Sequence, residues 1–569
     1  MRIHILTRII FLSLGFVVAA LVYMQIIRGG YYHAQSVNNR IRIVPIDAPR
    51  GRILDRNGVV LADNRPSYHV AVIPQDMEDP NALFGFIGRV LNKDPRVLAA
   101  VFTRRKLTPF DPVIVAQDVD RAALITVEEN RFQYPGLVIE QGFERFYPFH
   151  EAGSHAVGYV GKIDPTAADV LQGYGYTPSS LVGKNGVEQF YESELQGAPG
   201  GRQIEVNNRG REVRLLGTKA PGRGRDITIS LDQRLQSMAA ELLGERRGSV
   251  VMMDLSNGEV LALVSSPAFD PNVFTDRSRR GRIDAYMQNA QAPLFNRAIT
   301  GQYPPGSVFK VPLALAAVER KAVTPGTAFD CPGYYMLGKA RFGCAHVHGP
   351  EDLIQAIAHS CNVYFFHAGQ MVTAPIMGAY ARVFGLDHPT GIDLPFEAKG
   401  NLVLPGHKKG GWFTGNTLNL AIGQGDTLAT PLQLTVMIAA VANDGIILRP
   451  RVLKAFDGKP VRAPDLSRRP IIRLRDATWR VVQNGLRRTV DDPEGTARGL
   501  SDLKGLAIAG KTGTAQAGKE GDHAWFAGYV RSPKNNLAFC VLLEHGGPSS
   551  NAVLLARDLL ARMQAEGII

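Results

Sequence analysis

Residues 303–310 read YPPGSVFK, and this stretch carries the strongest chemical signal in the chain. Ser307 and Lys310 are three residues apart, so on a helix they share one face in adjacent turns. The Pro-Pro-Gly run before the serine predicts that a helix begins there, and a helix N-terminus favours developing negative charge. A serine hydroxyl is a weak nucleophile that needs a base, and a lysine can serve if burial lowers its pKa toward neutrality. The stretch therefore predicts a nucleophile and its base at the start of a helix.

Two further motifs follow in order along the chain. Ser360-Cys361-Asn362 lies in LIQAIAHSCNVYFF, a helix-like context, and offers a second hydroxyl and an amide. Lys511-Thr512-Gly513-Thr514 follows LAIAG at a predicted strand edge, where the lysine and two hydroxyls can hold a carboxylate and the glycine permits close approach of a substrate backbone. Each motif alone is common by chance: Ser-x-x-Lys recurs at Ser501 and Lys504, which we interpret as a solvated surface pair. The order and apolar context of all three motifs favour a serine acyl-transfer site.

The strands around these motifs predict an antiparallel sheet. Residues 248–265 (GSVVMMDLSNGEVLALVS) give two β-rich runs joined at an Asn-Gly step, which is a strong hairpin signal. A second strand pair, HAWFAGYV and NNLAFCVLLEH, precedes an apolar-periodic helix over residues 552–563. Mostly helical patterns lie between the two strand pairs. We therefore expect an α+β domain over residues 226–569, which begins after the Gly/Arg/Pro-rich stretch APGRGRD.

The N-terminal segment predicts a membrane anchor. Residues 9–27 carry no charge and, at 19 residues, approach the roughly 20 that a spanning helix needs. A cleaved signal peptide is the alternative, although its apolar run would be shorter. Arg2 and Arg8 favour a cytoplasmic tail at residues 1–8, with the rest of the chain on the outer face. Between anchor and α+β domain we expect a pedestal over residues 40–225, with a small lobe inserted at about 70–145.

Composition excludes several classes of protein. The formal net charge of +12 is spread thinly over 569 residues, and no long Lys/Arg run or aromatic-interleaved basic motif indicates a nucleic-acid site. Four cysteines are too few for a disulfide-built scaffold. Cys540 lies in the strand pattern LAFCVLL, which favours a buried structural thiol.

The three motifs, in this order, resemble those of the penicillin-binding proteins and serine β-lactamases. Further stretches resemble class B penicillin-binding proteins: RGRI at 50–53, DRNG at 55–58, HAVGYVG at 155–161, GKNGVEQFYESELQGAPG at 183–200 and AIGQG at 421–425. The similarity covers nearly the whole chain and is greatest to the elongation-type group, penicillin-binding protein 2. The division-specific group is the alternative.

The resemblance implies a peptidoglycan D,D-transpeptidase that is inhibited by β-lactams. Ser307 would attack the penultimate D-Ala carbonyl of a stem peptide, and Lys310 would take its proton. Ser360 and Asn362 would relay protons and orient the substrate amide. Lys511 would supply positive charge near the substrate carboxylate. Thr512, Gly513 and Thr514 would bind the substrate, with the two threonine hydroxyls on its carboxylate. Backbone N–H groups of Ser307 and Thr514 would form the oxyanion hole.

The same resemblance implies the setting and the partners. The protein would lie in the bacterial inner membrane, single-pass, with its bulk in the periplasm. No glycosyltransferase domain precedes the pedestal, so a partner would have to polymerise the lipid-linked precursor. The resemblance implies that this partner is a multi-pass glycosyltransferase of the shape, elongation, division and sporulation family. Other elongation-complex proteins would be further partners. A D,D-carboxypeptidase or β-lactamase-like hydrolase is the alternative class, although a β-lactamase would be about half as long and secreted. A penicillin-sensing receptor would need a cytoplasmic domain, which eight residues cannot form.

A cluster of metal-ligand residues surrounds the second motif. Cys331, Cys344 and Cys361 fall within 31 residues, with the spacing Cys-x12-Cys-x3-His-x12-Cys if His348 is the fourth member. Three thiolates and one imidazole suit a structural zinc. A Cys331–Cys344 disulfide with a free Cys361 is the alternative in an oxidising compartment. The elongation-type relatives carry a zinc site here with carboxylate, His and Cys ligands, so Cys331 and Cys344 would replace two acidic residues. His346 could substitute for His348.

Overall fold

A computed structural model describes residues 2–32, 41–106, 109, 112–163, 181–207, 212–275, 280–408, 410–461, 468–470 and 473–569. Residue 40, the expected start of the pedestal, lies outside these ranges. The chain divides into two compact units. One comprises residues 1–51, 64–144 and 196–224, and the other residues 52–63, 145–195 and 225–569.

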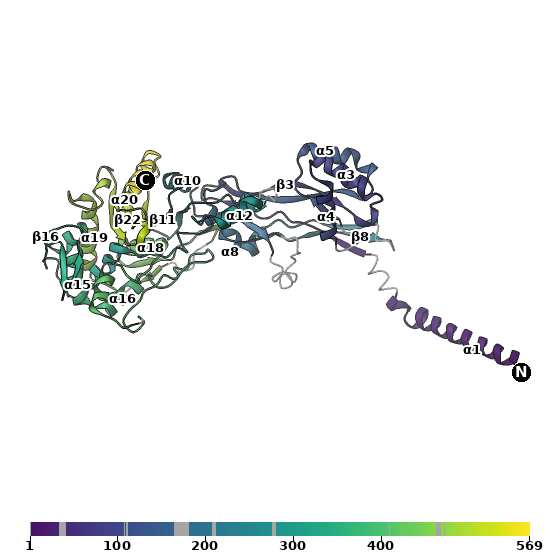
Figure 1. The fold of residues 1–569 in the computed structure, drawn as a ribbon, viewed down its shortest axis with the longest axis horizontal. Helices are drawn as coiled ribbons and strands as arrows, with labels where there is room; N and C mark the ends of the chain where they lie inside the picture. Colours follow the sequence, from purple (N-terminus) through teal and green to yellow (C-terminus); the bar gives the residue numbers. More distant parts are fainter. Residues whose placement is uncertain are drawn as a thin grey trace. The chain divides into compact units, whose positions relative to one another are not determined.

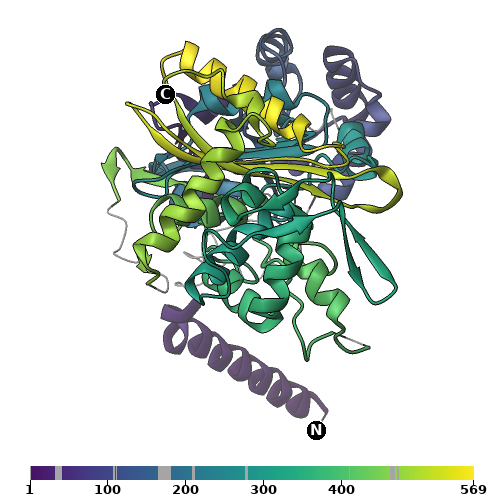
Figure 2. The same ribbon diagram turned by 90° about the vertical axis from the view of Figure 1, so that its left-hand side faces the viewer.

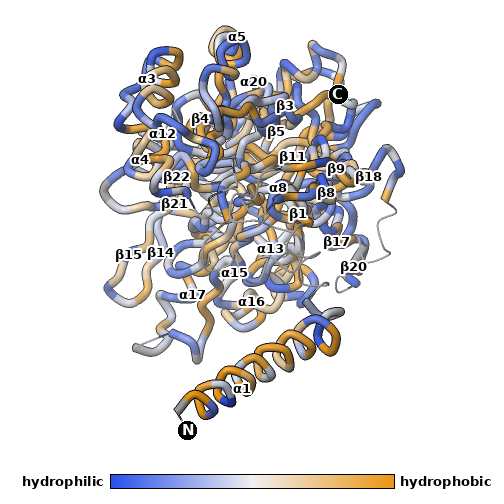
Figure 3. Tube along the Cα trace, turned by 90° about the vertical axis from the view of Figure 1, so that its right-hand side faces the viewer, coloured by the Kyte–Doolittle hydropathy of each residue, from blue (hydrophilic) through white to orange (hydrophobic). Residues whose placement is uncertain are grey.

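The N-terminal segment is one apolar helix. α1 (Arg2–Val22) continues into a π-helical turn, η1 (Tyr23–Ile27), and the described side chains from Ile3 onward are exposed over the span. Orange predominates along α1, with blue segments toward its N-terminal end (Figure 3). Within the described ranges, this is the one helix long and apolar enough to cross a membrane.

The first unit holds a small antiparallel sheet and a separate lobe. The sheet has the order β1-β8-β9, formed by β1 (Ile41–Ile46), β8 (Gly200–Val206) and β9 (Glu212–Lys219). In the lobe, β3 (Val60–Val72) pairs through residues 70–72 with β4 (Val113–Ala116), and it also pairs with β5 (Leu137–Phe146). Three helices cover this sheet, each capped by an aspartate that accepts backbone N–H bonds: α3 (Pro80–Leu91), α4 (Pro95–Arg105) and α5 (Arg121–Asn130). Short 3-10 turns, η2 (Pro74–Asp76) and η3 (Arg131–Gln133), complete the lobe.

The second unit is built on a five-stranded antiparallel sheet with the order β12-β11-β23-β22-β21. Its strands are β11 (Gly248–Asp254), β12 (Val260–Ser266), β21 (Ala507–Ala515), β22 (His523–Arg531) and β23 (Asn536–Leu543). The predicted Asn-Gly hairpin joins β11 and β12, with Gly258 at φ +77°. The predicted α+β fold is therefore confirmed, and β21, which carries the Lys-Thr-Gly motif, is an edge strand.

Strand alternation divides the core of this unit into two layers. Val250 and Met252 of β11 pack in a cluster with α10 (Gln233–Leu243) and α20 (Ser550–Ala565), whereas Val251 and Met253 face the larger helical cluster. In Figure 2 the yellow α20 lies on one side of the yellow-green strands and the green helices lie on the other. α18 (Pro431–Ala442), buried along its whole length, forms the centre of the helical layer.

The helical layer and the connections bring the three motifs together. The helices of this layer are α13 (Lys310–Glu319), α14 (Leu353–Ala358), α15 (Asn362–Val372), α16 (Ala374–Val383), α17 (Thr414–Ala421) and α19 (Asp476–Asp491). Two small hairpins pair β13 (Phe329–Cys331) with β16 (Gly349–Glu351) and β14 (Tyr334–Leu337) with β15 (Ala340–Gly343). Figure 1 shows α15, α16, α19 and β16 in one part of this unit.

Shorter elements complete the second unit. β10 (Ile227–Ile229) pairs with β2 (Ile53–Leu54) and with β18 (Leu453–Phe456), and β2 pairs with the first residues of β3 across the predicted Asn57-Gly58 turn. The remaining elements are α6 (Ser154–Val157), β6 (Val160–Lys162), β7 (Leu181–Gly183), α8 (Gly186–Phe190), α9 (Glu192–Leu195), α11 (Asn272–Thr275), α12 (Arg280–Gln288), η5 (Gly306–Phe309), β17 (Ile446–Leu448), β19 (Lys459–Pro460), β20 (Arg468–Pro470), η7 (Arg498–Leu500) and η8 (Gly518–Glu520).

Candidate active site

Ser307 lies in a single 3-10 turn, η5, directly before α13. The turn starts at Gly306, whose φ of +54° favours glycine and whose added Cβ would come within 2.8 Å of the Thr514 carbonyl oxygen. The Gly306 N–H donates to the Gly423 carbonyl at 3.0 Å. The half-buried Ser307 is thus held between β21 and the AIGQG stretch, slightly ahead of the α-helix that the Pro-Pro-Gly run predicts.

Lys310, the first residue of α13, is fully buried. Its Nζ donates to Asn362 Oδ1 at 2.7 Å, to the Ser360 carbonyl at 2.8 Å and to Ser360 Oγ at 3.3 Å. Burial lowers the pKa of Lys310 to about 8, while negative charge on the nearby cysteines opposes that shift. A lysine in this state can be neutral at a physiological pH and act as a base.

The Ser360 turn joins α14 to α15. Ser360 has φ +59°, a left-handed conformation that is uncommon outside glycine. Before it, His359 Nδ1 lies 2.8 Å from Glu351 Oε1, and after it, Cys361 Sγ caps α15 by accepting the Tyr364 N–H at 3.5 Å. Asn362 Nδ2 donates to the Gly343 carbonyl at 3.1 Å, which points the amide oxygen at Lys310. The turn geometry therefore directs both Ser360 and Asn362 toward the same ammonium.

The Lys-Thr-Gly motif lies on β21, opposite the Ser307 turn. Burial and the charge of Lys310 hold the pKa of fully buried Lys511 well below its usual value. A Cβ on Gly513 would meet the Pro305 carbonyl oxygen at 3.0 Å, so this glycine lets the strand lie against the nucleophile's turn. Thr514 Oγ1 accepts the Ser549 N–H at 3.3 Å, which leaves its own proton available to a carboxylate.

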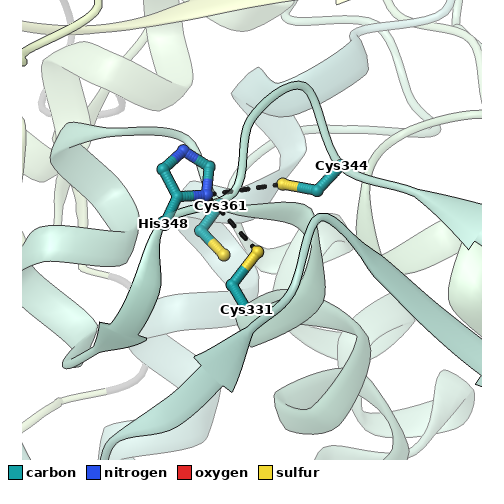
Figure 4. Close-up of side chains that lie close together, drawn as sticks. All are labelled: Cys331, Cys344, His348 and Cys361. Carbon is teal, nitrogen blue, oxygen red and sulfur yellow. Dashed lines mark hydrogen bonds between the residues drawn. The ribbon is translucent and has the colours of Figure 1, made fainter.

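Four potential metal ligands converge beside the Ser360 turn (Figure 4). The ligand atoms of Cys331, Cys344, His348 and Cys361 all lie within 4.8 Å of one another. His348 Nδ1 is 3.4 Å from Cys331 Sγ and 3.6 Å from Cys344 Sγ. A tetrahedral zinc with its usual bond lengths would separate sulfur and nitrogen by roughly 3.5 Å, so this donor set fits the ion.

The thiols and the two histidines of this cluster differ in their contacts. All four cysteines of the chain are free thiols in this structure. His348 contributes the imidazole, whereas His346 contributes a carbonyl that accepts from Cys331 Sγ at 3.7 Å. Hydrogen bonds from Cys361 and from backbone N–H groups lower the pKa of Cys344. The shift is toward the thiolate form of Cys344, which is the form of cysteine that binds a metal.

Several residues at the site lie outside the three motifs. Thr496 Oγ1 lies 2.7 Å from Thr512 Oγ1, and Gln424 Nε2 donates to the Thr514 carbonyl at 3.3 Å. Gln424 belongs to the AIGQG stretch, which could have identified it, but nothing local marks Thr496. The Tyr303 hydroxyl donates to buried Glu544, which also pairs with Arg297 at 3.0 Å. Ser501 and Lys504 are exposed, as expected of a surface pair.

Comparison with known proteins identifies the family. Residues 248–561 match the penicillin binding protein transpeptidase domain, and residues 45–229 match the penicillin-binding protein dimerisation domain. The peptidoglycan D,D-transpeptidase MrdA of Acinetobacter baumannii is 33% identical over 97% of this chain and 86% of its own length. MrdA of Escherichia coli K12 is 31% identical over 97% of this chain and 92% of its own length.

Solved structures agree with this identification. The penicillin-binding protein PBP2 of Helicobacter pylori, in its complex with MreC, superposes with a TM-score of 0.82 at 27% identity, over 93% of this chain and all of that chain. PBP2 of Pseudomonas aeruginosa superposes with a TM-score of 0.70 at 31% identity, over 91% of this chain and 96% of that chain. The motifs, the fold and these matches over nearly the whole length show that the chain belongs to the class B penicillin-binding proteins, in the group of the PBP2/MrdA peptidoglycan D,D-transpeptidases.

Proposed function

We propose that this protein cross-links peptidoglycan stem peptides during cell elongation, as a membrane-anchored D,D-transpeptidase that β-lactams inactivate. One observation carries the proposal: Lys310, three residues after Ser307, is fully buried and has a lowered pKa. Its Nζ donates hydrogen bonds to Ser360 and Asn362. A lysine in that state is poised to accept a serine proton. The matching of the transpeptidase domain over residues 248–561 supports the assignment.

In the acylation step, Lys310 accepts the Ser307 proton as Oγ attacks the penultimate D-Ala carbonyl. The backbone N–H groups of Ser307 and Thr514 would stabilise the oxyanion. Collapse of the tetrahedral intermediate breaks the peptide bond and expels terminal D-Ala, whose nitrogen takes a proton through Ser360. The substrate carboxylate would meet Thr514, whose hydroxyl proton is free, and its negative charge would favour the protonated form of buried Lys511.

In the transfer step, the amine of a neighbouring stem peptide attacks the acyl-serine. The amine gives up a proton to Lys310 through Ser360, and the new amide forms as the ester bond to Ser307 Oγ breaks. Lys310 returns the proton to Ser307 Oγ, which regenerates the serine. Water in place of the amine would make the protein a carboxypeptidase. A β-lactam acylates Ser307 by the same first step, but its leaving group stays tethered, so the acyl-enzyme turns over slowly.

We further propose that Cys331, Cys344, His348 and Cys361 hold a structural zinc ion. The converging ligand atoms and the lowered pKa of Cys344 support this set. The ion would supply rigidity rather than chemistry. Asn362 N donates to Cys344 Sγ at 3.2 Å, and Asn362 Nδ2 donates to the neighbouring Gly343 carbonyl, so a fixed Cys344 keeps the Asn362 amide directed at Lys310.

The cellular setting follows from the N-terminal helix. We propose that α1 and η1 anchor the protein in the inner membrane with residues 1–8 in the cytoplasm and residues 28–569 in the periplasm. A structure described as coordinating polymerization and crosslinking in a peptidoglycan synthase complex aligns over 98% of this chain, with a TM-score of 0.74 and 31% identity. That likeness supports a multi-pass glycosyltransferase partner that polymerises lipid-linked precursor, and the MreC complex of the H. pylori protein supports further elongation-complex partners.

Fluorescent penicillin labelling of intact membranes tests the acylation site. Wild-type protein should give one labelled band of its own size, and Ser307→Ala should give none. The transpeptidase assignment is tested separately by incubating purified protein with a glycosyltransferase and lipid-linked precursor. Penicillin-sensitive cross-linked dimers are expected; release of free D-Ala without dimers would instead identify a carboxypeptidase.

A further inference from the structure

A short connection after α19 contacts both the segment before the Ser360 turn and the Lys-Thr-Gly strand. It spans residues 492–497 and turns sharply at Gly495, where an added Cβ would come within 2.4 Å of the Thr489 carbonyl oxygen. His359 Nε2 lies 3.5 Å from Asp492 Oδ1, and the Thr496 N–H donates to the Ala358 carbonyl at 3.2 Å. The backbone of Thr496 is therefore hydrogen-bonded to Ala358, the last residue of α14, which lies two residues before Ser360.

The Thr496 side chain bridges from this fixed point to the substrate strand. Thr496 Oγ1 is 2.7 Å from Thr512 Oγ1 and 3.3 Å from the Ala358 carbonyl oxygen. Thr512 itself is 2% exposed, so few partners are open to its hydroxyl. Thr496 thus contacts both Ala358, at the end of α14, and Thr512, on β21, which are 154 residues apart in the sequence.

Counting protons shows what this contact can do. Each hydroxyl has one proton to donate and two lone pairs to accept with. When Thr496 donates to Ala358, Thr512 donates to Thr496 and has only lone pairs left for a ligand. When Thr496 donates to Thr512 instead, the Thr512 proton becomes free for an anion. The Ala358 carbonyl keeps the Thr496 backbone N–H in both arrangements, so neither leaves it unpaired.

We propose that Thr496 is a positioning residue for carboxylate recognition. Its hydroxyl proton moves from the Ala358 carbonyl oxygen to Thr512 Oγ1, so that Thr512 can donate its own proton to the terminal carboxylate of the substrate or β-lactam. The proposal rests on the proposed function, because it assumes that penicillin acylates Ser307 and that Thr512 faces the carboxylate. Thr496 acts through Thr512, and its effect is confined to ligands that carry the negative charge.

A comparison of benzylpenicillin with its methyl ester tests this directly, with full-length purified protein. Thr496→Val keeps the shape and the backbone N–H but removes the hydroxyl, and Thr496→Ala removes it without added bulk. The second-order acylation constant for the free acid should fall about tenfold or more in both variants, the usual effect of losing a hydrogen bond to a charged group. The constant for the ester should stay within about twofold of wild type, and Thr496→Ser should restore the free-acid rate.

Thr489→Val is the matched control, because Thr489 is also a buried threonine of this region whose hydroxyl donates only to the Gly485 carbonyl, at 3.2 Å. It should leave both constants unchanged. Equal losses for acid and ester in Thr496→Val and Thr496→Ala would show a merely structural role and overturn the proposal, as would no loss for either ligand. Absence of any Ser307 adduct in wild-type protein would instead refute the proposed function, so the two failures are distinguishable.

Discussion

Lys310 shows how one side chain acquires its chemistry from its surroundings. The residue is fully buried, and its Nζ donates hydrogen bonds to the Ser360 carbonyl oxygen and the Asn362 amide oxygen. Burial disfavours the charged form, whereas negative charge on the nearby cysteines favours it. The effect of burial is the larger, since the pKa falls to about 8. The same environment that costs stability for an ammonium therefore prepares a base.

Replacing this base should slow acylation without unfolding the protein. We expect Lys310→Ala to reduce the penicillin acylation rate by roughly 10²–10⁴-fold, the usual contribution of a general base. Stopped-flow kinetics on purified protein measures the rate, and circular dichroism checks the fold. Lys504→Ala, in the exposed second Ser-x-x-Lys sequence, is the control and should behave as wild type. An unchanged rate in Lys310→Ala would remove this lysine from the mechanism.

The pH dependence of acylation should report the same group. Because the neutral amine is the active form and its pKa is about 8, the second-order acylation constant should rise with pH up to about 8 and level off above it. Below that value the constant should fall about tenfold per pH unit. Measurements between pH 6 and 9.5 on wild-type protein test this, and a constant that is flat from pH 6 to pH 8 would contradict it.

The residues of the three motifs could be predicted because their order along the chain is a signal in itself. Thr496 could not, since its role depends on a hydroxyl that meets Thr512 across the fold. The left-handed conformation of Ser360 was also beyond prediction, because serine has no local preference for it. Contacts that depend on long-range packing cannot be predicted from the local sequence pattern.

Among the elements, the strands were the easiest to predict and the short turns the hardest. β11, β12, β22 and β23 have strong β propensity, and an Asn-Gly step marks one hairpin. The 3-10 turn that holds Ser307 depends instead on Gly306 being pressed between Gly423 and Thr514. The small β13–β16 and β14–β15 hairpins, which bring the cysteines together, likewise lie in a Gly-rich segment with little apolar periodicity.

Removal of the proposed zinc should loosen this group of hairpins. Protein purified without a metal-affinity tag should contain near one zinc per chain, and chelation should lower both its melting temperature and its penicillin acylation rate, because Cys344 and Gly343 position Asn362. Cys344→Ala should lose the metal, whereas Cys540→Ala, on the central sheet, should keep it. Metal-free protein with a Cys331–Cys344 disulfide and full activity would contradict the assignment.

At the scale of the whole molecule, one apolar helix is expected to decide where the protein works. α1 and η1 expose their apolar side chains throughout the described part of the helix, as a lipid-facing span would. The uncharged run of residues 9–27 predicted such a span, although the helix already begins at Arg2. The division of the chain into two units was harder to predict, because residues 52–63 and 145–195 belong with the catalytic unit although they are separate in sequence.

Deleting residues 2–27 behind a secretion signal should separate anchoring from catalysis. The truncated protein should move from the membrane to the soluble periplasmic fraction and still react with fluorescent penicillin. Full-length protein should remain in the membrane fraction with its original N-terminus, which N-terminal sequencing can establish. A mature protein that begins after residue 27 would show that the helix is a cleaved leader.

The central claim is that Ser307 carries the acyl group, and mass spectrometry of the penicillin-treated protein tests it most directly. After tryptic digestion, the mass of one opened β-lactam should appear on the peptide that contains Ser307, and fragmentation should place it on that serine. The peptides that contain Ser360 and Ser501 should be unmodified. An adduct on either of those residues, or a Ser307 peptide that stays unmodified while the protein binds penicillin covalently, would contradict the account.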